Sequence, residues 1–136
     1  MSSKKDKTKP INNYYMGLAL ALARENAGLT KENPSVGCVL VKNNQIISTG
    51  ITSINGRPHA EYNAVKNSVD NVSGSTAYVT MEPCTHKGKT DPCSSLLIKS
   101  KIKKVYFSVS DIDERTSNKA LKVFKRKGIV VKKGIL

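Results

Sequence analysis

Residues 76–99 read TAYVTMEPCTHKGKTDPCSSLLIK, and this stretch decides the predicted fold. A strand is predicted over residues 76–81, and a short helix over residues 93–99 begins at Cys93. Glu82-Pro83-Cys84 directly follows the strand, and a polar loop joins it to the helix. Since open α/β sheets place their ligands at the carboxyl ends of strands, we expect Cys84 and Cys93 to meet at such an edge.

A second short motif, His59-Ala60-Glu61, completes a candidate metal site. A helix is predicted over residues 59–69, so His59 and Glu61 lie in its first turn, where the helix dipole favours an ionised carboxylate. One imidazole and two thiolates leave the fourth position of zinc open for water, as a catalytic site requires. The ordered set is typical of zinc-dependent base deaminases. We predict that His59, Cys84 and Cys93 bind zinc and that Glu61 is catalytic, moving a proton from water to the departing amine.

Two other interpretations of these residues are open. The first is a closed structural zinc site, for which His86 would supply the fourth ligand. The second is a pair of unrelated core thiols. Cys38 lies in the middle of a predicted strand among valines and is expected to be a small core side chain.

The remaining segments predict a helix–strand order of α-β-β-α-β-α-β-α-β. An amphipathic helix is expected to begin at Asn12 or Asn13 and to close at Gly28. Its apolar face would be formed by Tyr15, Leu18, Ala19, Leu22 and Ala23. Residues 36–41 and 45–49 predict a hairpin around Asn43-Asn44. Residues 104–109 and 129–131 predict strands, and residues 118–127 a helix with Gly128 after it. The fold class is α/β, a three-layer α-β-α sandwich with a mixed five-stranded sheet.

Length and composition indicate one domain in a reducing compartment. The chain has 136 residues and three cysteines, so we expect a single domain over residues 11–136, in the cytoplasm and without a membrane partner. Residues 1–10 hold four lysines and predict a disordered basic tail. The net charge of +13 fits an anionic substrate or nucleic acid, and equally a solvated lysine-rich surface.

Three motifs resemble the deaminase domain of riboflavin-biosynthesis deaminase–reductases, a branch of the cytidine-deaminase superfamily. They are NPSVGCV at 33–39, PHAE at 58–61 and EPCTHKGKTDPC at 82–93. Eight residues separate Cys84 from Cys93, whereas nucleic-acid adenosine deaminases of the superfamily have two between their thiols. The resemblance implies a cytidine-deaminase-like fold and a homo-oligomer. It also implies hydrolytic removal of the 2-amino group of a diaminopyrimidinone that carries a ribosylamino 5′-phosphate.

The resemblance further implies which residues contact this small phosphorylated pyrimidine. Asn33, His86 and Lys89 match substrate-binding positions of the family. Thr52 stands where many members have a histidine. Asp111 and Asp113 lie in the loop that helps to hold the substrate phosphate in relatives. In this chain Asp113 and Glu114 would repel a phosphate unless Arg115 or Lys119 compensates.

Other functions are open at this point. The altered loop after Asp111 favours a deaminase of another free base or nucleotide, of the cytosine or guanine type. The basic charge favours an RNA-editing deaminase, but the cysteine spacing and few aromatic residues oppose it, so we do not expect a nucleic-acid partner. A zinc-stabilised binding module is the third possibility. No Gly-x-Gly-x-x-Gly follows a strand, so we expect deamination without use of NADPH. An end at Leu136 fits either a stand-alone deaminase or part of a longer protein.

Overall fold

The structure is a computed structural model that describes residues 7–88, 91–110 and 118–136. The predicted order of helices and strands is confirmed in these residues. The elements are α1 (Lys9–Glu25), β1 (Gly37–Lys42), β2 (Gln45–Ile51), α2 (Ala60–Asn67), β3 (Thr76–Met81), α3 (Cys93–Lys99), β4 (Lys104–Val109), α4 (Ala120–Arg126) and β5 (Val130–Lys132).

The five strands form one mixed sheet in the order β2-β1-β3-β4-β5. β1 pairs antiparallel with both β2 and β3, and β3, β4 and β5 are parallel to one another. Asn43 and Asn44 both have positive φ, 52° and 61°, as a tight two-residue hairpin turn requires. The carboxyl ends of β3 and β4 therefore lie at the same edge of the sheet as the segment that enters β1.

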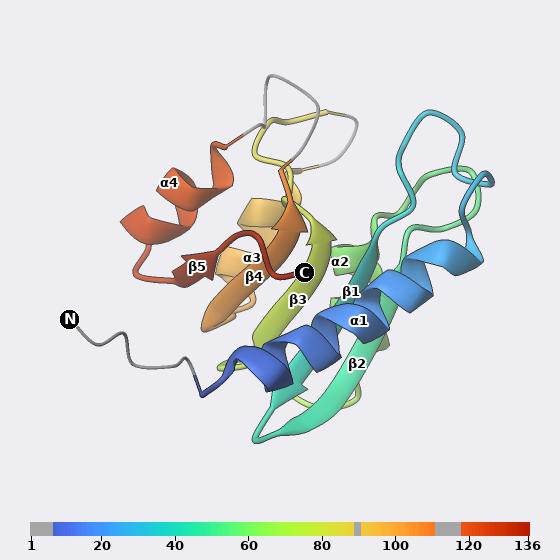
Figure 1. Cartoon of the computed structure of the whole chain (residues 1–136). Helices are drawn as coiled ribbons and strands as arrows, with labels where there is room; N and C mark the ends of the chain where they lie inside the picture. Colours follow the sequence, from blue (N-terminus) through green and yellow to red (C-terminus); the bar gives the residue numbers. More distant parts are fainter. Residues whose placement is uncertain (1–6, 89–90, 111–117) are drawn as a thin grey trace.

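Helices cover both faces of the sheet, so the three-layer prediction is confirmed (Figure 1). α1 packs on β1 and β3 through one buried cluster, which contains Tyr15, Met16 and Tyr78. α2, α3 and α4 share a second buried cluster on the opposite face, built around Phe107 and Phe124. Among the described residues, no helix combines the length and the hydropathy needed to cross a bilayer.

The predicted start of the first helix is wrong. α1 begins at Lys9, with Thr8 as N-cap and Pro10 in the first turn, where proline loses no hydrogen bond because its missing N–H would have no partner. Lys9 and Pro10 therefore belong to the helix and not to a tail, and Asn12 is buried inside it. The helix also ends before Gly28, at Glu25. The other predicted boundaries differ from the observed ones by two residues or fewer.

Two glycines let the helices approach the sheet closely. A Cβ atom on Gly37 would lie 2.0 Å from the carbonyl oxygen of Ala19 in α1. A Cβ atom on Gly50 would lie 2.2 Å from the carbonyl oxygen of Ala60 in α2. Since Ala60 directly follows His59, the absence of a side chain at Gly50 lets the start of α2, and with it the candidate metal ligand, lie close to β2.

Candidate active site

His59, Cys84 and Cys93 come together at the carboxyl end of β3. His59 is the N-cap of α2, Cys93 is the first residue of α3, and Cys84 follows β3 after Glu82 and Pro83. One nitrogen or sulfur atom from each residue lies within 4.8 Å of the other two. The Sγ of Cys93 is 3.5 Å from the Nδ1 of His59. The structure thus brings the predicted ligands into one cluster.

The donor atoms fit a tetrahedral zinc ion. With Zn–S of about 2.3 Å and Zn–N of about 2.0–2.1 Å, neighbouring sulfur and nitrogen ligands lie about 3.6 Å apart. The distance between Cys93 Sγ and His59 Nδ1 agrees with this value. Within the described part of the chain, no further His, Cys, Asp or Glu joins the group, so His86 does not close it as a fourth ligand. Three protein ligands are the number typical of a catalytic zinc site.

The backbone at the start of α3 stabilises the sulfur of Cys84. The amide of Cys93 donates a hydrogen bond to Cys84 Sγ at 3.2 Å, and the amide of Ser94 donates to the carbonyl of Cys84 at 3.1 Å. A helix amide of this kind favours a thiolate. The first amide of α3 thus acts on the sulfur of Cys84, the ligand that precedes the helix.

The three ligands also perturb one another's protonation. A hydrogen bond with the Cys93 thiol lowers the pKa of Cys84 to about 4, and a hydrogen bond with His59 lowers it as well. Burial of the Cys84 thiol acts in the opposite direction. The same hydrogen bond and burial raise the pKa of Cys93. The hydrogen bond to Cys84 raises the pKa of His59. One thiolate is therefore already favoured at neutral pH, which suits a cluster that binds a cation.

Glu61 lies beside this cluster without belonging to it. Its side chain is only 4% exposed, and burial raises the pKa of its carboxyl group to about 7. The charge on Cys84 raises this pKa further, and His59 and a hydrogen bond with Cys93 lower it. A metal ion at the cluster would favour the ionised carboxylate. A buried carboxyl group in this position can accept a proton and release it again.

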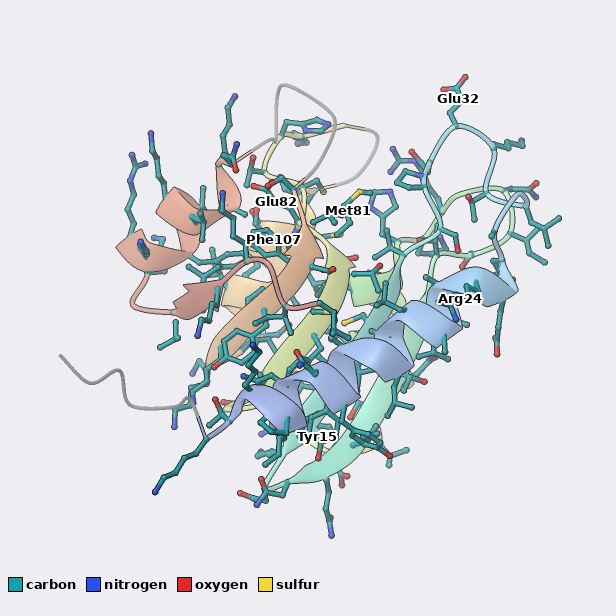
Figure 2. All side chains as sticks on the ribbon, in the orientation of Figure 1. Tyr15, Arg24, Glu32, Met81, Glu82 and Phe107 are labelled. Carbon is teal, nitrogen blue, oxygen red and sulfur yellow. The ribbon has the colours of Figure 1, made fainter. Side chains whose placement is uncertain are left out.

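Glu82 is a structural residue of the site that the sequence did not indicate. Its carboxylate is 3% exposed; Oε1 accepts a hydrogen bond from the amide of Asn118, and Oε2 one from the amide of Ala120, both at 2.9 Å. Figure 2 shows Glu82 with Met81 at the end of the sheet remote from Tyr15. The start of α4 is thereby attached to the turn that carries Cys84. The position of Glu82 in Glu-Pro-Cys was the only available signal.

Comparison with protein families identifies the family of this chain. Residues 9–109 match the family model described as the cytidine and deoxycytidylate deaminase zinc-binding region, and this range includes all three residues of the cluster. The chain belongs to this deaminase family. Zinc is the metal of the family, so the predicted cofactor is confirmed at that level.

Relatives of this deaminase domain have names from riboflavin biosynthesis. The riboflavin biosynthesis protein RibD of Actinobacillus pleuropneumoniae is 45% identical over 122 residues, which are 90% of this chain and 32% of that protein. The diaminohydroxyphosphoribosylamino-pyrimidine deaminase of Buchnera aphidicola subsp. Acyrthosiphon pisum is 44% identical over 123 residues, 90% of this chain and 84% of that protein. The solved structure of Acinetobacter baumannii RibD superposes with a TM-score of 0.89 at 40% identity, covering 95% of this chain and 36% of that one. The chain thus spans about a third of the RibD proteins that it matches.

The loop before β1 brings Asn33 to the same edge of the sheet as the deaminase cluster, because β1 runs antiparallel to β3. Asn33 is half-buried, and its Nδ2 donates a hydrogen bond to the carbonyl of Gly56 at 2.9 Å. Gly56 has a φ of +94°, which favours glycine. This bond joins the loop to the segment that leads to His59.

Thr52 has a structural role at the start of β1. Its side chain is 1% exposed, its hydroxyl accepts a hydrogen bond from the amide of Val36 at 2.9 Å, and its carbonyl accepts one from Asn26. Thr52 therefore supports the backbone at the start of β1, and a contact of Thr52 with the substrate stays a prediction. The threonine hydroxyl accepts a backbone hydrogen bond at this position, and comparison of sequence motifs does not reveal this contact.

The remaining predicted substrate contacts are only partly described. His86 is half-buried in the segment between the two cysteine ligands. Lys89, Asp111 and Asp113 lie outside the described residues, so their roles stay predictions. Cys38 is fully buried in β1, and burial raises the pKa of its thiol, as expected for a core side chain.

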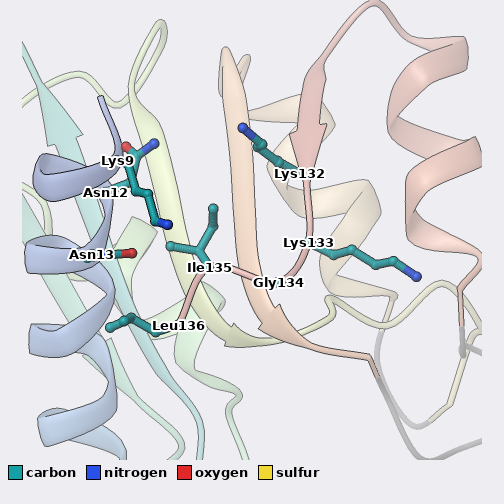
Figure 3. Close-up of a pocket in the computed structure, with 8 residues that line it drawn as sticks. All are labelled: Lys9, Asn12, Asn13, Lys132, Lys133, Gly134, Ile135 and Leu136. Atoms are coloured by element: carbon teal, nitrogen blue, oxygen red, sulfur yellow. The ribbon is translucent and has the colours of Figure 1, made fainter. Parts of the chain in front are cut away.

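A cavity of about 380 Å³ lies between the start of α1 and the segment after β5 (Figure 3). Its lining includes Lys9, Asn12, Lys132 and Lys133. None of the cluster residues lines this cavity. It is therefore separate from the deaminase site.

Proposed function

We propose that the chain catalyses the hydrolytic deamination of a diaminohydroxyphosphoribosylaminopyrimidine, with release of ammonia. The observation that carries this proposal is the convergence of His59, Cys84 and Cys93 within 4.8 Å, with the buried carboxyl group of Glu61 beside them. Such a group of one imidazole, two thiols and a separate glutamate matches hydrolytic removal of an amino group from a heterocyclic base.

Similarity to named relatives supports this choice of substrate. The Buchnera aphidicola protein named diaminohydroxyphosphoribosylamino-pyrimidine deaminase is 44% identical, and the match extends over 84% of its length. The eight residues between Cys84 and Cys93 also fit the riboflavin-pathway members of the family better than members with a two-residue spacing. A nucleotide such as dCMP is the second candidate, because the matched family model covers deoxycytidylate deaminases.

The residues of the chain have distinct tasks in the proposed reaction. His59, Cys84 and Cys93 would hold the zinc ion, which supplies a Lewis acid and brings the pKa of water close to neutrality. Glu61 takes a proton from the attacking water and later gives a proton to the amine that leaves as ammonia. Asn33, His86 and Lys89 would orient the pyrimidine ring. The carbon–nitrogen bond to the 2-amino group breaks as a carbon–oxygen bond from water forms.

An ammonia-release assay on a panel of compounds tests this proposal. The panel contains the phosphorylated diaminopyrimidinone, dCMP, cytidine, guanine and tRNA, each with and without NADPH. We expect ammonia from the first compound at a rate at least about tenfold above that of any other, since polar groups placed for one substrate reject others strongly. We also expect no change in NADPH absorbance. Faster ammonia release from dCMP would show that the substrate is a nucleotide of this kind and not the diaminopyrimidinone. Ammonia release from tRNA would show that the protein acts on nucleic acid and not on a small molecule.

Two further predictions concern the location of the protein in the cell and its oligomeric state. We propose that it works in the cytoplasm and that it forms a homo-oligomer. Large apolar side chains such as Tyr62 in α2, 45% exposed, are available for contacts between copies. Sedimentation of the zinc-loaded protein would test the second prediction, and a purely monomeric species would contradict it.

A further inference from the structure

Asn63 in α2 holds both of the peptide groups that flank the metal ligand His59. The side-chain Nδ2 of Asn63 donates a hydrogen bond to the carbonyl of Pro58 at 3.3 Å. The backbone amide of Asn63 donates a hydrogen bond to the carbonyl of His59 at 3.1 Å. Because a peptide group is planar, the carbonyl of Pro58 moves together with the amide of His59. The backbone on either side of the His59 Cα atom is therefore attached to one residue.

The same side chain closes the base of the segment that follows β2. Its Nδ2 also donates to the carbonyl of Ile51 at 2.7 Å and to the hydroxyl oxygen of Ser53 at 2.9 Å. The amide of Ser53 in turn donates to the carbonyl of Pro58 at 3.1 Å. Asn63 thus connects the end of β2 to Pro58 at the other end of this segment, both directly and through Ser53.

The contacts of this side chain require an amide NH2 group. The carbonyl oxygens of Ile51 and Pro58 only accept hydrogen bonds, so the donor end of Asn63 must face them. Asn63 is half-buried, and these carbonyls would lose a donor if the side chain were apolar. Leucine has nearly the same size as asparagine but donates no hydrogen bond, which makes Asn63→Leu a direct test of the contacts.

The backbone of His59 decides where its ring nitrogen lies. Nδ1 is the ring nitrogen that lies 3.5 Å from the Sγ of Cys93, and only Cβ and Cγ separate it from Cα. His59 is the N-cap of α2 and has an extended backbone, with a ψ of 164°, so the helix holds only its carbonyl. The amide side of this ligand therefore depends on other contacts, and Asn63 supplies one through its side chain.

We propose that Asn63 is a positioning residue of the zinc site, which holds His59 in place before the metal binds and thereby raises the affinity for zinc. A ligand that is already ordered costs less to bring into a complex. This inference rests on the assignment of the cluster as the zinc site and needs no particular substrate. Zinc affinity is measured without substrate, so its failure is distinguishable from failure of the proposed deamination.

The zinc affinities of two pairs of matched variants test this role. Asn63→Ala and Asn63→Leu are compared with Asn67→Ala and Asn67→Leu. Asn67 lies one turn further along α2, about 6 Å from Asn63 along the helix, and its Nδ2 also donates to a carbonyl of β2, that of Thr49, at 3.4 Å. It therefore makes the same kind of contact away from His59.

Titration with zinc against a competing chelator gives the expected difference. In both Asn63 variants, we expect the zinc Kd to rise about tenfold. This is the lower end of the range of about 10–100-fold for loss of an outer-shell partner, because Asn63 holds the backbone of His59 and not its ring. In both Asn67 variants, the Kd should change by less than about twofold, since this hydrogen bond is long and exposed.

Unfolding of the metal-free protein in urea separates positioning from a general structural role. A residue with only a structural role would lower the unfolding midpoint and leave the zinc Kd of the folded protein unchanged, and this result would overturn the proposal. An equal rise in Kd in the Asn63 and Asn67 variants would also overturn it.

A measurement on the unaltered protein covers the case in which the Asn63 variants do not fold. In the metal-free protein, we expect the side-chain NH2 protons of Asn63 to exchange with water more slowly than those of exposed Asn67, because the Asn63 contacts are present before zinc binds. Exchange at Asn63 that is as fast as at Asn67, and that slows only when zinc is added, would show that zinc orders this side chain and would overturn the proposal.

Discussion

Replacement of Cys84 and Cys93 together by alanine is expected to remove zinc from the protein and to reduce ammonia release to background. The two thiols supply two of the three donor atoms that lie within 4.8 Å of one another. Loss of even an outer-shell partner typically costs about 10–100-fold in metal affinity, so loss of two ligands should cost far more. Metal analysis of dialysed protein measures the effect directly.

Cys38→Ala is the matched control for this double variant. It also removes a thiol, but that thiol is fully buried in β1 and lies outside the ligand cluster. We expect Cys38→Ala to keep about one zinc per chain, as a single catalytic site would. Zinc stoichiometry that stays unchanged when Cys84 and Cys93 are both replaced would show that the cluster is not the metal site.

Glu61→Gln is expected to keep the zinc ion and the fold and to lose at least about a hundredfold in kcat, because positioned proton transfer contributes about 10²–10⁴-fold. Glutamine matches the shape of the buried glutamate side chain but cannot take up the proton of the attacking water. The measurements are kcat for the phosphorylated diaminopyrimidinone and zinc content of the same preparation.

Glu25→Gln, at the exposed end of α1, is the control that makes the same chemical change away from the site. It should leave both kcat and zinc content unchanged. If Glu61→Gln lost its zinc together with its activity, Glu61 would be a metal ligand, and the assignment of proton transfer to this residue would be wrong.

The central part of the fold was predictable because local signals mark its boundaries. The predicted limits of β3, α3 and β4 agree with the structure, since Pro83 interrupts the chain after β3 and Cys93 follows Pro92 at the start of α3. The start of α1 was not predictable in this way. The helix begins with Lys9 and Pro10, which equally fit a solvated tail, and a tertiary contact, the hydrogen bond that the hydroxyl of Tyr78 donates to Asn12, attaches this turn to the sheet.

The candidate site was likewise predictable from the sequence only in part. The metal ligands follow from residue type and spacing. Their convergence follows because β2 and β3 are both antiparallel to β1, so the segments that leave β2 and β3 lie at the same edge of the sheet. The role of Thr52 depends on its hydrogen bond to Val36, 16 residues away in the chain. A cavity of about 770 Å³ that Lys66 and Lys99 help to line exists because α2 and α3 lie side by side. Contacts of this kind have no local signature in the sequence.

The position of Glu82 makes metal binding and the docking of α4 linked equilibria. Its carboxylate holds the amides of Asn118 and Ala120, and Cys84 follows it by two residues. Zinc that orders the Cys84 turn must therefore stabilise the start of α4. By reciprocity, a ligand that orders the start of α4 must raise the affinity of the protein for zinc by the same factor. Amide hydrogen exchange at Ala120 is expected to slow when zinc binds and to quicken on chelation, while exchange at Val79 in the centre of the sheet changes little. Equal slowing at both amides would show that zinc stabilises the whole domain and not this connection.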